Sequence, residues 1–212
     1  MKIDYMQSTT PKAFGSGARH ETSGRALVDA ISVTAEVCGQ PLSAAAAEML
    51  AKDLGNFEES VIQAALARCR MELQGPLKMA DILVRVEDGR PDVDEAWSMM
   101  PQSEQASVVW TDEMAQAWGL ALPLLSAGDI GGARTAFREA YAKAVLDARI
   151  RRKPVHWTPS LGSDVTGRKR VLLDAVRKGR LSRAHVEQLL PAGAASIGME
   201  AIVAQVKFKN LH

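Results

Sequence analysis

The side chains with the strongest chemical character in this sequence are basic, and they are concentrated in one stretch. From Arg149 to Arg183 the chain has eleven Lys and Arg residues and only two acidic ones, Asp164 and Asp174. A stretch of one sign attracts polyanions, and nucleic acid is the most common of these. The predicted nucleic-acid-binding residues are Arg149, Arg151, Arg152, Lys153, Trp157, Arg168, Lys169, Arg170, Arg177, Lys178 and Arg180.

Two other interpretations of this stretch stay open. Its charge can form a solvated surface that acidic residues balance in the folded protein, or it can bind an acidic protein partner. Trp157 has two interpretations as well. An exposed tryptophan among basic residues can stack on a base of single-stranded nucleic acid, whereas a loop tryptophan more commonly fills the core.

The spacings that support catalysis or metal binding are missing from the sequence. The four histidines are scattered, and Cys38 and Cys69 belong to apolar helical patterns that are typical of buried, reduced thiols. Asp92, Asp94 and Glu95 lie close together, but acids in the first turn of a helix also stabilise that helix. No metal-binding, nucleophile-elbow or nucleotide-binding pattern occurs. We therefore predict that the protein is not an enzyme and has no catalytic residue, metal site or cofactor.

Composition indicates a globular protein built mainly of helices. Of the 212 residues 47% are hydrophobic and 24% are charged, which is sufficient for a core, and only 5% are aromatic. No apolar run approaches the roughly 18 residues that a membrane span needs, and the N-terminus lacks the pattern of a signal peptide. We expect no membrane partner and a cytoplasmic location.

The elements that must position the basic residues are helices, and the first group of them is acidic. Residues 1–100 carry a net charge of −5, and the remaining residues carry +6. After a flexible arm at 1–23, helical spacing and capping residues predict helices from about 24, 43, 57, 79 and 92. We expect one acidic helical domain over 24–100, which binds a protein partner, with its core formed by Leu27, Ile31, Leu50, Leu54, Ile62, Leu66, Leu73, Ile82 and Leu83.

The second group of elements carries the basic stretch. Residues 101–105 are expected to be a linker, 107–110 a short extended piece and 156–162 a loop. One helix is predicted to start at Thr111, and the next is predicted to end before Pro154. A third is predicted over 165–178, and a last one follows Ser182. This basic helical domain covers 107–190, and 191–212 forms a tail. The predicted fold is all-α, with two small bundle-like helical lobes and little or no β-sheet.

The order of the helices between Leu27 and Trp97 carries a resemblance. A second helix ends in Asp53-Leu-Gly-Asn-Phe57, a third ends in Met71-Glu-Leu, and Gly75-Pro-Leu-Lys-Met-Ala-Asp-Ile82 leads into a fourth. This pattern resembles the N-terminal part of phage replicative-helicase loaders and loader-inhibitor proteins, although Gly75 stands where that family has an aromatic residue. The resemblance implies a non-enzymatic adaptor that docks on a replicative helicase and brings it to single-stranded DNA or withholds it. It assigns no functional residue.

Three functional hypotheses follow. The first is the replication adaptor that the resemblance implies, which would act in a bacterial host cytoplasm if a phage encodes it. The second is a phage-type helical inhibitor or regulator that binds a host nucleic-acid-processing complex. The third is a DNA-binding regulator that uses the helix near Arg168–Lys178 for recognition.

Overall fold

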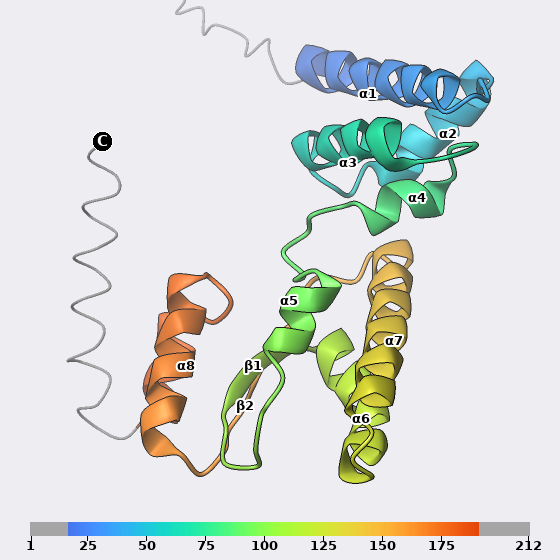
Figure 1. The fold of residues 1–212 in the computed structure, drawn as a ribbon. Coiled ribbons are helices and arrows are strands. Elements are labelled where there is room, and N and C mark those ends of the chain that lie inside the picture. The colour runs from blue at the N-terminus through green and yellow to red at the C-terminus, as the bar shows by residue number, and fades with distance from the viewer. Residues whose placement is uncertain (1–16, 191–212) are drawn as a thin grey trace, which may run out of the picture. The chain divides into compact units, whose positions relative to one another are not determined.

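The computed structural model describes residues 17–190, and this part of the chain is mainly helical (Figure 1). The helices fall into two compact units, one ending at Glu87 and the other beginning at Asp88. The only sheet among the described residues is a pair of short strands. The prediction of a mainly helical fold with little β-sheet is therefore confirmed. No helix within 17–190 has the length and apolar character that a membrane span requires.

Over residues 17–87 the first unit contains four helices, α1 Gly17–Val37, α2 Ala44–Leu54, α3 Glu59–Glu72 and α4 Met79–Val84. The side chain of Ser43 caps α2 by accepting a hydrogen bond from the backbone N–H of Ala46. Helix α1 packs on α2 and α3, and α3 packs on α4. Of the predicted core residues, seven are buried, while Leu50 and Leu73 are half-buried.

The second unit begins with helix α5 and a helical hairpin. Its elements are α5 Val93–Ser98, β1 Val108–Thr111, α6 Asp112–Ser126, α7 Ile130–Ile150, β2 Trp157–Ser160, α8 Val165–Arg177 and α9 Arg183–Leu189. Gly128, at φ 81°, makes the tight turn between α6 and α7, which lie side by side in Figure 1. The rings of Trp97, Phe137 and Tyr141 pack in the core between α5 and this hairpin.

The two strands connect the hairpin to α8. Strand β1 pairs antiparallel with β2, and the register places Val108 opposite Ser160 and Thr111 opposite Trp157. A second core, formed by Val109, Leu172, Ala175, Leu181, Val186 and Leu190, joins β1 to α8 and α9. Figure 1 shows α8 beside this ribbon. The predicted extended piece at 107–110 is thus β1.

Three expectations differ from the structure. Helix α1 begins at Gly17, inside the predicted arm, whose first sixteen residues lie outside the described residues, as does the predicted tail 191–212. The predicted loop 156–162 contains strand β2, because β1 offers it backbone partners that local sequence does not reveal. The third difference is the domain boundary. We predicted it within 101–110, but the units divide after Glu87, and α5 packs on α7 of the second unit.

Candidate nucleic-acid interface

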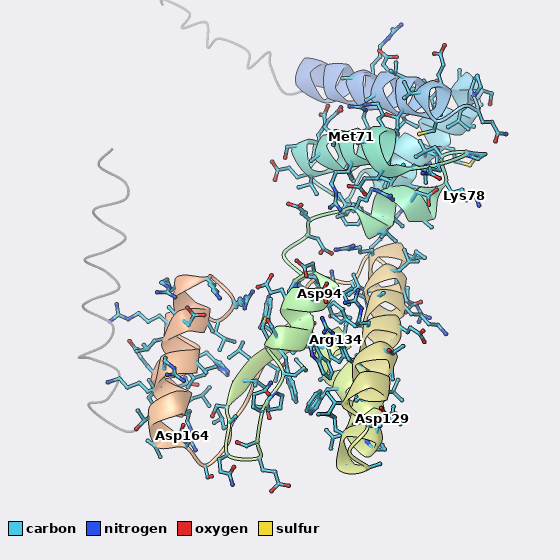
Figure 2. The ribbon with its side chains drawn as sticks, viewed as in Figure 1. Met71, Lys78, Asp94, Asp129, Arg134 and Asp164 are labelled. Atoms are coloured by element: carbon cyan, nitrogen blue, oxygen red, sulfur yellow. The ribbon has the colours of Figure 1, made fainter. Side chains whose placement is uncertain are left out.

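Helix α8 carries four of the eleven predicted nucleic-acid-binding residues, and its start is fixed by one acidic side chain. Asp164, labelled in Figure 2, accepts hydrogen bonds from the backbone N–H groups of Thr166 and Gly167. A Cβ atom at residue 167 would lie 2.3 Å from Oδ2 of Asp164, so a larger residue there would displace this carboxylate from its capping position. Leu172 and Ala175 are buried in the second core, which leaves the basic residues on the other faces of the helix.

A cavity of about 650 Å³ lies between α8 and β1. Its apolar lining comes from Met99, Val108, Val109, Val171, Leu173 and Ala175, and its charged and polar lining comes from Ser107, Arg170, Asp174, Arg177, Lys178 and Arg180. Four of the eleven predicted residues therefore meet around one cavity, namely Arg170, Arg177, Lys178 and Arg180. Four cations against one carboxylate give this lining a charge of 3+.

The cations on the rim are held loosely. Arg177 and Lys178 pair with the carboxylate of Asp174, with 3.0 Å between Lys178 Nζ and Asp174 Oδ2, and about half of each basic side chain is exposed. Burial acts to raise the pKa of Asp174, but hydrogen bonds from Lys178 and Arg177 outweigh it, so the pKa lies below its ordinary value. Arg170 is exposed and has no ion pair among the described residues. Exposed ion pairs of this kind are weak, so an incoming anion can replace them.

Arg180 differs from these three residues because its side chain is only 15% exposed and has fixed partners. Its guanidinium lies 4.4 Å from the centre of the Trp157 ring. Nη2 donates to Oε1 of Glu95 at 2.8 Å, and Nη1 lies 3.5 Å from Sδ of Met99. Trp157 is half-buried and packs against both cores of the second unit. This placement agrees with the interpretation of Trp157 as a core residue, with Arg180 covering its ring.

The remaining predicted residues do not line the cavity. Arg149 is a correction: its side chain is only 7% exposed and is paired with Asp88. Arg151, Arg152 and Lys153 are exposed after the end of α7, where Arg151 pairs with Asp147. Lys169 is half-buried, as is Arg168, whose Nη2 donates to the backbone oxygen of Gly162 at 2.6 Å.

A buried ionic cluster accounts for the position of Arg149. Arg90 pairs with Asp88 and with Glu113, and Arg149 pairs with Asp88 from the last turn of α7. Burial acts to raise the pKa of Asp88, but the hydrogen bond and charge of Arg149 outweigh it, so the pKa lies below its ordinary value. The hydroxyl of Tyr141 donates to the backbone oxygen of Pro91 at 2.8 Å beside this cluster. The cluster is not visible in the sequence, because up to 61 residues separate its members and no local pattern joins them.

The closely spaced acids Asp92 and Asp94, and His156, make structural contacts. The carboxylate of Asp92 caps α5, and Asp94 of the same helix pairs with Arg134 and Arg138 of α7; Figure 2 labels Asp94 and Arg134. Nδ1 of His156 is 3.0 Å from Oδ1 of Asp112 on an exposed surface. Within residues 17–190 no group of three His, Cys, Asp or Glu side chains could hold a metal ion.

A second cavity of about 740 Å³ in the same unit has a different chemistry. Trp97, Trp110 and Trp118 line it together with aliphatic side chains, and Glu104 is its one charged lining residue. Without cations it is unsuited to a polyanion. The cavity between α8 and β1, which we call the basic cavity, is therefore the candidate interface.

The fold and this site define a mainly α-helical protein of two units, in which the second unit carries a basic cavity. No protein-family model, curated protein or solved structure matches the chain.

Proposed function

We propose that the protein is a non-enzymatic adaptor that contacts single-stranded DNA through the basic cavity of its second unit. The observation that carries this proposal is the meeting of Arg170, Arg177, Lys178 and Arg180 around one cavity. Cations dispersed over a solvated surface do not create such a local field, whereas cations gathered in a concave site do. The exchangeable pairs of Arg177 and Lys178 with Asp174 let both side chains turn to a phosphate group.

The protein partner in this proposal is a replicative helicase, and it rests on the family resemblance of residues 27–97. We assign the partner surface to the first unit. Large hydrophobic side chains are exposed there, including Val33 and Val37, which are one turn apart on α1, and Met71 at the end of α3 (Figure 2). Exposed apolar side chains at neighbouring positions mark a contact surface more often than isolated ones do.

The DNA part of the proposal is tested by charge reversal. We would measure binding of a fluorescent oligothymidylate to the full chain by anisotropy at several salt concentrations, for the wild type and for the double variant R170E/K178E. The double variant R134E/R138E is the matched control, because it makes the same change of charge on exposed, ion-paired arginines that lie off the cavity.

We expect R170E/K178E to weaken binding at least tenfold and to flatten the salt dependence by about 0.7 in log–log slope for each lost phosphate contact. R134E/R138E should change both quantities much less. Equal effects of the two variants would show that binding follows total charge, and the proposal would then be wrong.

The partner part is tested by capture from a bacterial lysate with the tagged full chain and with R170E/K178E. Both should retain a replicative helicase, because its surface lies on the first unit. Capture of a different nucleic-acid-processing complex would favour the alternative of a helical inhibitor.

A further inference from the structure

The basic cavity has an apolar interior in addition to its charged rim. Met99, Val109 and Ala175 line the cavity together with the four cations, and their apolar side chains make no favourable contact with the phosphate groups of a bound strand. We propose that the cavity takes one unstacked nucleobase of a single strand, stacked on the guanidinium of Arg180, while Arg170, Arg177 and Lys178 bind the flanking phosphates. This inference rests on the proposed function and specifies which part of the nucleic acid enters the site.

Arg180 is the residue that makes a base, and not only a phosphate, the expected occupant. Cζ of its guanidinium lies over the Trp157 ring, 4.4 Å from the ring centre, and Glu95 and Met99 contact its two terminal nitrogens. The plane is therefore fixed before any ligand binds, and Arg180 still lines the cavity. Arginine planes stack on unpaired bases in single-stranded nucleic acid. We expect the base to stack on this guanidinium from the side of the cavity.

The size and lining of the cavity fit a nucleobase. Its volume of about 650 Å³ lies within the range of sites that enclose small organic ligands. Aliphatic walls on β1 and α8 suit the faces of an aromatic ring. Arg170 and Arg177 of α8 and Lys178, the residue that follows this helix, lie within three turns of each other. In a duplex the bases are already paired and stacked, so they cannot enter. The geometry therefore favours a single strand over a duplex of equal charge.

The test compares strands of equal charge that differ in their bases. We would measure the affinity of the wild type for an oligothymidylate, for an oligomer of abasic sites of the same length, and for the corresponding duplex. The variant R180K keeps the positive charge but lacks the planar guanidinium group. R183K on α9 is the matched control, because Arg183 is exposed and does not line the cavity. L173F narrows the cavity without changing Arg180 or the net charge. Thermal melting establishes that each variant is folded.

We expect the wild type and R183K to bind the oligothymidylate about tenfold more tightly than the abasic oligomer, as one stacked base would give. R180K and L173F should reduce this preference to less than about threefold while they retain affinity for the abasic oligomer. Equal affinity of the wild type for both oligomers, with R170E/K178E still weakening both, would overturn the base site and leave the proposed function intact. If R170E/K178E weakens neither oligomer, the proposed function itself fails. Displacement of the strand by an acidic peptide such as poly-glutamate at similar concentration would also overturn the base site.

Discussion

Nη2 of Arg149 lies 3.0 Å from Oδ1 of Asp88, so the last turn of α7 is joined to the first residue of the second unit. Both side chains are nearly buried, at 7% and 12% exposed. Together with the packing of α5 on α7, this pair ties residues 88–100 to the second unit, and it keeps the guanidinium of Arg149 away from solvent.

Replacement of Arg149 by alanine should destabilise the second unit strongly. The substitution leaves the carboxylate of Asp88 buried with one cation fewer, and breaking a buried ion pair in this way costs about 3–5 kcal/mol. The free energy of unfolding from urea titration followed by circular dichroism measures the effect. R151A, which removes an exposed arginine two residues later, should change it by less than about 1 kcal/mol. If the two variants are equally stable, the buried cluster does not stabilise the unit.

The same cluster predicts how stability depends on pH. The pKa of Asp88 is lower in the folded protein than its ordinary value near 3.9, so its charged form stabilises the folded state. This contribution is fully present above the ordinary pKa and is lost as the pH falls through the lower, folded pKa. The wild type should therefore lose stability below about pH 4, and D88N, although less stable at pH 7, should lose less over that range. If the free energy of unfolding falls equally with pH in the wild type and in D88N, this prediction is wrong.

Two glycines should respond to alanine in opposite directions. G167A places a Cβ against the carboxylate of Asp164 and should cost about 1 kcal/mol, because the α8 cap is displaced. Gly119 lies inside α6, where an added Cβ atom would meet nothing within 4 Å, so G119A should stabilise by about 0.5–1 kcal/mol. Thermal melting of both variants shows whether each substitution raises or lowers stability. If G167A raises it, the Asp164 cap is dispensable.

The two thiols should differ in reactivity. Cys69 is fully buried and burial raises its pKa, whereas Cys38 is half-buried. The reactive species of a thiol is the thiolate, so in the native protein Cys38 should react with iodoacetamide faster than Cys69. Peptide mass spectrometry after timed labelling distinguishes the two sites. Equal labelling rates of the two thiols in the folded protein would mean that the core around Cys69 opens readily.

Local signals in the sequence were sufficient for most helices of the fold. The caps at Ser43, Thr111 and Ser182 and the apolar spacing of α3 and α8 are visible in sequence, and each functions as expected. Strand β2 could not be predicted in this way, because its partner β1 lies some fifty residues earlier. The domain boundary was missed for the same reason, since the contacts of Asp88 and Arg90 lie on α6 and α7.

The candidate site, too, was predictable from sequence only in part. Its basic character is visible in the composition of 149–183, but charge alone cannot separate Arg149, which is buried, from Arg170, which is exposed. Three of its six apolar lining residues, Met99, Val108 and Val109, lie far from the basic stretch in sequence. For Trp157 the sequence left a stacking role and a core role open, and in the structure this residue packs against both cores beneath the guanidinium of Arg180.

The most direct test of the central claim is a map of the surface that DNA contacts. Backbone amide chemical shifts of the ¹⁵N-labelled full chain would be followed by NMR during titration with an oligothymidylate. We expect the largest changes at Val108 and Val109 of β1 and between Arg170 and Arg180, with small changes at Arg151–Lys153. Changes centred on Arg151–Lys153, or no change at β1 and α8 under conditions where the strand binds, would contradict this claim.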